Sequence, residues 1–188
     1  ASVSALVCVI VAVLLSILNR NSNSKLSNAQ VEFAKLGYAV PGAVIAVGVL
    51  IPAGWIDNQL NLLTSAWFQK SIGLVVSGSL SLLIFAYIVR FLSVSIQTVE
   101  SGLSSIKPNI DESAYCLGAS RLKVTRQIHL PLLRSSLVTA FILVFVDVLK
   151  ELPATLILRP FNFNTLAVRT YELASDERLM DAALPALT

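Results

Sequence analysis

The sequence predicts an all-α integral membrane protein, a polytopic bundle of helices, and three observations support this class. Of the 188 residues, 55% are hydrophobic and only 13% are charged, about half the charged share of a soluble globular domain. The mean hydropathy is +0.77. The apolar residues also gather in long uninterrupted runs, as helices that cross a bilayer require.

Four apolar runs predict the membrane spans. The first three, residues 1–18, 36–56 and 71–89, contain no charged residue, and each is close to the ~20 residues that a helix needs to cross the hydrocarbon core. The fourth run, residues 135–152, crosses a bilayer only if it tolerates charge near its end. The charged residues there are Asp147, Lys150 and Glu151.

Lysine and arginine are unevenly distributed between the loops, and this predicts the orientation. They outnumber the acidic residues in segments 19–35 and 90–134, but not in segments 56–70 and 159–181. By the positive-inside rule, the first two segments are expected in the cytoplasm and the other two outside. The net charge of +3 therefore indicates loop bias in a protein surrounded by a lipid bilayer, and no nucleic-acid partner is expected.

Few residues could perform chemistry on a substrate. Cys8 and Cys116 lie far apart without CxxC spacing, and His129 is the one histidine, so neither a disulfide framework nor a zinc site is expected. No nucleophile and base form a pair, and the Walker A pattern of ATP-binding loops is absent. The sequence therefore predicts a protein that is not an enzyme, binds no cofactor and needs a partner to use ATP.

A polar loop, residues 109–131, interrupts the apolar chain and contains local helix signals. Asn109 and Glu112 form an N-x-x-E capping box, which predicts a first short helix over 110–117. Gly118 suits the left-handed position that ends a helix. The loop is therefore expected to be ordered.

A second short helix is predicted after Gly118. Ser120 can cap it, and it is expected to cover 121–129. Leu130 and Pro131 then bend the chain back toward the fourth span. We expect two short helices with a glycine corner at the cytoplasmic surface.

Individual residues of this loop also have ordinary structural explanations. Glu112 can serve as a capping carboxylate, and the basic residues can follow from topology and from contact with lipid phosphate. His129 can interact with the dipole at the end of the second helix. Taken together, the ordered loop on one face of a membrane protein indicates a docking element.

The spacing of seven residues in the loop resembles the cytoplasmic signature of bacterial ATP-binding cassette (ABC) importer permeases. That signature reads E-A-A, three residues, G, nine residues, and I-x-L-P. Ser113 replaces an alanine of the signature, which exchanges one small residue for another. The matching residues are Glu112, Ser113, Ala114, Gly118, Ile128, Leu130 and Pro131.

The resemblance implies a multi-pass permease of the bacterial inner membrane, a helical bundle with cytoplasmic coupling helices. The seven residues would dock in a groove of the cytoplasmic ATP-binding subunit dimer, which would bind and hydrolyse ATP. An external (periplasmic) substrate-binding protein would deliver the cargo. Arg159, Arg169 and Glu172 lie on the side where that protein would dock.

Two further stretches, 90–118 and 148–184, resemble the iron(III)-type branch of these permeases, whose members are long fusions of two similar halves. The stretch 150–172 carries most of this likeness. On this resemblance the chain is the C-terminal half of such a fusion, its missing N-terminal half is a partner, and the cargo is iron(III). The alternatives are the same architecture for another cargo, such as thiamine, a polyamine or an oxyanion, and an ATP-independent carrier.

The charges near the end of the fourth run are candidates for the translocation path. Asp147 and Lys150 are spaced i,i+3 and can pair on one helix face, and with Glu151 they would give the path a polar lining. The alternative places all three at the external interface. A permeation path should hold its cargo weakly, so the lack of a metal-ligand cluster in the sequence does not contradict iron transport.

Overall fold

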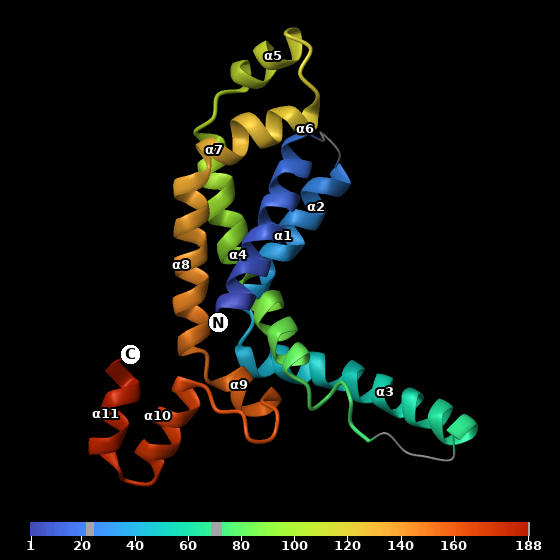
Figure 1. Ribbon diagram of the computed structural model, residues 1–188, viewed down its shortest axis with the longest axis vertical. Coiled ribbons are helices and arrows are strands. Elements are labelled where there is room, and N and C mark those ends of the chain that lie inside the picture. The colour runs from blue at the N-terminus through green and yellow to red at the C-terminus, as the bar shows by residue number, and fades with distance from the viewer. Residues whose placement is uncertain (22–24, 69–72, 188) are drawn as a thin grey trace. The chain divides into compact units, whose positions relative to one another are not determined.

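The computed structural model describes residues 1–21, 25–68 and 73–187, and the chain divides into two compact units (Figure 1). Unit 1 comprises Ala1–Tyr38 and Phe91–Val146, and unit 2 comprises Ala39–Arg90 and Asp147–Thr188. Within the described residues all regular secondary structure is helical. The predicted all-α class is confirmed.

Helices α4 and α8 each pass from one unit into the other, η1 is a 3-10 helix and η2 is a π-helix. The helices of the described part are, in chain order, α1 (Ser2–Asn21), α2 (Lys25–Lys35), η1 (Leu36–Ala39), α3 (Gly42–Phe68), α4 (Leu80–Ser104), α5 (Pro108–Cys116), α6 (Arg121–Val124), η2 (Thr125–His129), α7 (Leu130–Leu132), α8 (Arg134–Lys150), α9 (Pro153–Leu158), α10 (Leu166–Ser175) and α11 (Leu179–Leu187).

The core of unit 1 forms where α1, α2, the second half of α4 and the residue before α8 pack together. Gly102 lets α4 and α8 approach closely, because a Cβ atom at this position would lie 2.8 Å from both Ser136 Cβ and Leu133 Cδ2. The buried core residues are Ala12, Ile17, Val31, Ile96, Val99, Leu103, Ile106 and Leu133.

Among the residues that the structure describes, three helices are long and apolar enough to cross a membrane. The qualifying segments are Ser2–Arg20 of α1, Gly42–Ser65 of α3 and Leu80–Ser104 of α4. Arg121–Leu132 and Arg134–Lys150 pass the same test together but are bent by 68°, so they add a fourth span only if the bent pair counts as one. These helices agree with the predicted membrane class.

The helix in the third predicted span, 71–89, has different boundaries from those expected. Ser71 and Ile72 lie outside the described residues, residues 73–79 are not helical, and α4 begins only at Leu80. No charged residue within 71–89 marks the non-helical stretch, because the carboxylate that binds its backbone, that of Asp57, lies in α3. Asp57 accepts hydrogen bonds of 2.7–3.0 Å from three backbone N–H groups, those of Val75, Val76 and Ser77.

The ends of two helices also lie beyond the predicted loop boundaries. α4 continues to Ser104, so Arg90 and Glu100, which were assigned to the cytoplasmic loop, lie within a helix. α3 continues through Pro52 to Phe68, past the expected end at residue 56. Charge and proline marked these positions as boundaries, but Arg90 lies within α4 and is paired with Glu151, and Pro52 lies inside α3.

Candidate functional site

The polar loop folds as two short helices with a glycine corner, in the upper part of Figure 1. α5 ends at Cys116, and Gly118 adopts φ +78°, the left-handed conformation predicted for the corner. Ser120 is the N-cap of α6, and its hydroxyl accepts from the Lys123 N–H at 3.4 Å. The predicted corner and second cap are confirmed.

The predicted capping box at the start of α5 is wrong. The N-cap is Lys107, which makes no side-chain cap, and Pro108 occupies the first turn. Proline has its φ fixed near the helical value and lacks the N–H that a cap would satisfy, so it starts the helix earlier than Asn109. Asn109 and Glu112 therefore lie inside α5, and the capping explanation of Glu112 does not hold.

The second helix is longer than predicted and contains a wide turn. α6, η2 and α7 follow one another without a break from Arg121 to Leu132. In η2 the Leu130 N–H donates to the Thr125 carbonyl oxygen, five residues back, which defines the π-turn. The predicted bend is present, but the helix passes through Pro131 and the 68° turn follows Leu132.

A buried carboxylate joins the loop to the rest of unit 1. Asp111 on α5 accepts from Arg20 Nε on α1 through Oδ2, at 2.9 Å, and from His129 Nε2 on η2 through Oδ1, at 2.8 Å. Arg20 also donates to the carbonyl oxygens of Leu103 at 2.6 Å and Ile106 at 2.9 Å, at the end of α4. We call Arg20, Asp111 and His129 the Asp111 junction.

The charge state of the junction follows from its hydrogen bonds. Burial of the Asp111 carboxyl opposes ionisation, but the hydrogen bonds from His129 and Arg20 outweigh it, so the pKa of Asp111 lies below its usual value. His129 is completely buried and lies in the last turn of η2, near the helix end as expected, and the partner of its Nε2 is Asp111; the interaction with the helix dipole stays a prediction. Sequence reasoning missed the junction because Arg20 and Asp111 are 91 residues apart.

The two sides of the loop differ in exposure. Asp111 and Ala114 are the buried residues of α5, and Val124 and His129 are buried in α6 and η2. Of the seven signature residues, Ala114 is buried, Ile128 and Leu130 are half-buried, and the exposed ones are Glu112, Ser113, Gly118 and Pro131.

The three predicted path residues are not brought together. No ion pair joins Asp147 and Lys150 within the described part of the chain, and Lys150 is exposed at the end of α8. Glu151 is instead buried, with 6% of its surface exposed, and pairs with Arg90 Nε at 3.3 Å. The predicted Asp147–Lys150 pair is therefore wrong. The ion pair at the end of α8 joins Glu151 to Arg90 of α4 instead.

Hydrogen bonds fix the backbone around Glu151. Its Oε1 accepts from the Ala154 N–H at 3.2 Å, in the first turn of α9, and its carbonyl oxygen accepts from Thr155 Oγ1 at 2.6 Å. Since the one Thr155 hydroxyl proton is used there, the Tyr87 hydroxyl donates to Thr155 Oγ1, also at 2.6 Å. A Cβ atom on Gly42 would collide with Arg90 and Glu151, so α3 begins directly against the pair.

An uncharged polar hollow of about 420 Å³ lies between α4 and α8 in unit 1. Its α4 residues fall in the segment 90–134 that was expected in the cytoplasm, its α8 residues fall at the start of the fourth predicted span, and no ionisable residue lines it. Thr98 and Thr139 donate to carbonyl oxygens four residues back, which satisfies their hydroxyl protons within the helix. The lining residues are Gln97, Thr98, Ser101, Ser135, Ser136 and Thr139.

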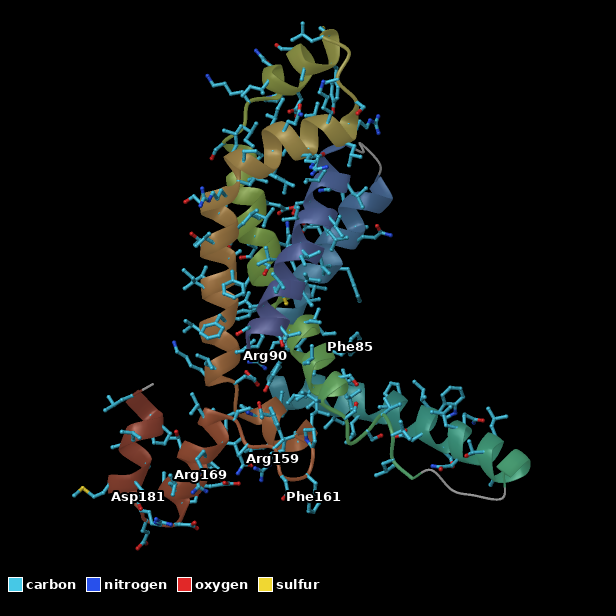
Figure 2. The ribbon with its side chains drawn as sticks, viewed as in Figure 1. Phe85, Arg90, Arg159, Phe161, Arg169 and Asp181 are labelled. Carbon is cyan, nitrogen blue, oxygen red and sulfur yellow. The ribbon has the colours of Figure 1, made fainter. Side chains whose placement is uncertain are left out.

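The loop between α9 and α10 presents an aromatic residue. Phe161 is fully exposed, and Asn162 next to it adopts φ +62°, so the loop makes a tight turn (Figure 2). Arg159 holds the base of the turn through Asn164 and through Glu172 of α10, to which it pairs at 2.9 Å. Within the described residues, no group of three or more His, Cys, Asp or Glu side chains is placed to hold a metal ion.

Comparison with known proteins agrees with this architecture. The sequence profile of the family described as "Binding-protein-dependent transport system inner membrane component" matches residues 6–173. An Fe(3+)-transport system permease protein of Haemophilus influenzae is 28% identical over 150 residues, which cover 80% of this chain and 26% of that protein. The ferric transport system permease protein of Actinobacillus pleuropneumoniae is 27% identical over 146 residues, covering 74% of this chain and 20% of that protein.

A second kind of relative is named for a different cargo. A putative 2-aminoethylphosphonate transport system permease protein of Salmonella paratyphi A is 27% identical over 145 residues, 77% of this chain and 49% of that protein. The chain thus spans about a quarter of the length of the ferric relatives and about half that of the phosphonate relative. The resemblance to the iron(III)-type branch is confirmed by the ferric relatives.

Proposed function

Because the chain belongs to the family of binding-protein-dependent transport system inner membrane components, we propose that it is a permease part of an ABC importer in which a separate subunit hydrolyses ATP. The chain contains no Walker A pattern, so the cytoplasmic ATP-binding subunit dimer would bind ATP and this chain would bind no cofactor. The signature spacing from Glu112 to Pro131 supports docking of that dimer on the polar loop.

The observation that carries this proposal is the exposed apolar corner of the loop. Leu117 and Leu122 flank Gly118, and 88% and 77% of their surfaces are exposed. Apolar side chains that stand free beside polar ones are typical of a protein docking surface. Glu112 is also exposed and does not cap α5, so its carboxylate is available to a partner.

For the cargo we propose iron(III), supported by the similarity to ferric transport permeases. A small oxyanion such as a phosphonate is the second candidate, because a phosphonate-type relative matches nearly as much of the chain. Iron(III) would pass through as a weakly held substrate, which needs no tight cluster of metal ligands along the path. Asp147, Lys150 and Glu151 stay candidates for the path lining, and the hollow between α4 and α8 is a further one.

Two further partners follow from the family and from the length of the relatives. A substrate-binding protein would dock outside, and the turn with Phe161, held by Arg159 and Glu172, presents a fixed aromatic side chain of the kind that anchors protein interfaces. The other half of a fused permease would cover the remaining faces of the bundle, since ferric relatives are about four to five times the matched length. We propose the orientation with the loop 109–131 in the cytoplasm.

Copurification of the complete permease with its ATP-binding subunits tests the docking. Leu117→Asp should reduce the recovered ATP-binding subunit roughly tenfold, as expected when a central interface contact worth more than about 1.4 kcal/mol is lost. Leu179→Asp is the matched control, because this leucine of α11 is 68% exposed and lies outside the loop. Equal recovery from both variants would contradict docking on the corner.

Uptake assays separate the two cargoes. Proteoliposomes with the complete transporter, its external binding protein and internal ATP are given radiolabelled iron(III) or radiolabelled 2-aminoethylphosphonate. ATP-dependent accumulation of iron(III) alone supports the first proposal. Accumulation of the phosphonate alone replaces it with the second, and uptake without ATP would favour a carrier that needs no ATPase.

A further inference from the structure

The three residues of the Asp111 junction lie on three separate elements, and one carboxylate connects them. Asp111 comes from α5, Arg20 from the last turn of α1, and His129 from η2. Arg20 reaches further, to the Leu103 and Ile106 carbonyl oxygens at the end of α4. A displacement of α5 therefore acts on α1, α4 and η2 through a single group.

The remaining polar contacts of α5 stay local. Within the described residues, its other side-chain hydrogen bond runs from Ser113 Oγ to the Asn109 carbonyl oxygen, inside the helix. At the corner, the Ala119 N–H donates to the Ala114 carbonyl oxygen. Asp111 is thus the side chain that ties α5 by hydrogen bonds to the membrane helices.

The bonds at the junction suit a connection that transmits force. They are charge-assisted, 2.6–2.9 Å long, and such bonds are stronger and more directional than neutral ones. The side chains are mostly shielded from water, with 18% of Arg20, 12% of Asp111 and 1% of His129 exposed. If one partner moved alone, the others would keep buried and unpaired charge, so the four elements are expected to move as one body.

Asp111 and Glu112 are neighbours with different surroundings. Glu112 is exposed on α5, whereas Asp111 is buried against α1 and η2. A docking partner can touch the first without reaching the second. Contact with the partner and transmission to the membrane helices are therefore assigned to different residues of one short helix.

We propose that Asp111 and Arg20 are positioning residues that convert movement of the docked loop into movement of α1 and α4, and that they do not contribute to docking itself. This inference rests on the proposed function, because it requires an ATP-binding subunit on the loop. The two roles separate in experiment. Loss of docking removes association, whereas loss of transmission leaves association and reduces the cargo moved per ATP.

The experiment uses the complete transporter in proteoliposomes and measures three quantities: recovered ATP-binding subunit, the rate of ATP hydrolysis, and cargo taken up per ATP. Asp111→Asn keeps the shape of the side chain but removes its charge. We expect unchanged association, hydrolysis within about twofold of the unaltered transporter, and cargo per ATP reduced roughly tenfold, in the range of coupling between linked sites.

Arg20→Lys provides a second variant in case Asp111→Asn lowers the folded yield. Lysine keeps the positive charge but lacks the guanidinium fork that reaches a carboxylate and two carbonyl oxygens at once, so cargo per ATP should fall here too. Lys35→Gln is the matched control. Lys35 pairs with Glu32 and Glu100 at 2.8 Å, joining α2 to α4 in the same unit without touching the loop, and its removal should leave cargo per ATP unchanged.

Three outcomes would overturn the inference. If Asp111→Asn and Arg20→Lys reduce association, hydrolysis and uptake in equal proportion, the junction only stabilises the fold. If cargo per ATP stays at the unaltered value in both variants, or falls equally in Lys35→Gln, the junction does not transmit. If the unaltered transporter itself shows no association and no ATP-dependent uptake, the proposed function fails, and this inference with it.

Discussion

Arg90 and Glu151 form an ion pair within unit 2, although Arg90 lies in the middle of α4 and Glu151 follows the end of α8. The contact between Nε and Oε2 is 3.3 Å, and Glu151 is 6% exposed. Charge inside a membrane helix is expensive unless it is paired. The pair explains how an apolar span keeps an arginine and why the glutamate can be buried.

Breaking one partner of the Arg90–Glu151 pair should destabilise the protein more than replacing both. Arg90→Met or Glu151→Gln leaves the other charge buried, which costs about 3–5 kcal/mol. The double variant should lose less stability than the two single variants together, because it leaves neither charge buried without a partner. Thermal unfolding of the purified permease in detergent measures the three values. Additive losses would mean that the two side chains do not interact.

Gly42→Ala should also destabilise the protein. The new methyl group would collide with the guanidinium of Arg90 and with the carboxylate of Glu151. Overpacking of this kind costs about 1–3 kcal/mol. Gly48→Ala, in the same helix, is the control, since nothing lies within 4 Å of its Cβ position; alanine there should gain about 0.5–1 kcal/mol. The same melting assay decides, and an equal shift in both variants would exclude the steric cause.

The two cysteines report on exposure and on orientation. Cys116 is exposed near the loop corner, whereas Cys8 is completely buried in α1. A membrane-impermeant maleimide should label Cys116 alone, in inside-out but not in right-side-out vesicles, and the ATP-binding subunit should protect it. Cys116→Ser should abolish the signal. Labelling from the outside would contradict the proposed orientation.

The stability that Asp111 provides should be lost in acid. Its pKa is lowered in the folded protein, so the contribution of the carboxylate is complete above the unfolded value of about 3.9 and declines as the pH falls through the lower folded value. The difference in melting temperature between the unaltered protein and Asp111→Asn should therefore be constant at neutral pH and narrow below about pH 4. A difference that is unchanged in acid would indicate that the charge of Asp111 does not support the junction.

Local signals in the sequence were sufficient for the outline of the loop. Gly118 and Ser120 act on their own backbone or on residues three positions away, and both predictions are confirmed. The capping box failed because Pro108 also acts locally and starts the helix first. Both the capping box and Pro108 are short-range signals for a helix start, and the helix begins at Pro108, whose ring fixes φ near the helical value.

Long-range polar contacts were beyond sequence reasoning. Asp57 pairs with N–H groups 18 to 20 residues away, and Arg20 pairs with a carboxylate 91 residues away. Nothing in the sequence around Asp57 or Arg20 indicates which residues they bind. Hydropathy therefore placed the start of α4 too early, and the positive-inside rule was the only explanation for Arg20. The roles of the signature residues and of Asp147 and Lys150 stay predictions.

The π-turn of η2 imposes a constraint on how this loop can change in length. In η2 the Leu130 N–H reaches back five residues to Thr125, so the turn contains one residue more than an α-helix would place there. Deleting one residue between Thr125 and Ile128 would convert the wide turn into an α-turn, and because each kind of turn completes about one revolution, the residues after it would keep nearly the same direction around the helix axis. Surface loops usually accept deletions, but this one should accept a deletion only within the wide turn, since loss of a residue from α6 would rotate His129 by about 100° around the helix axis, away from Asp111.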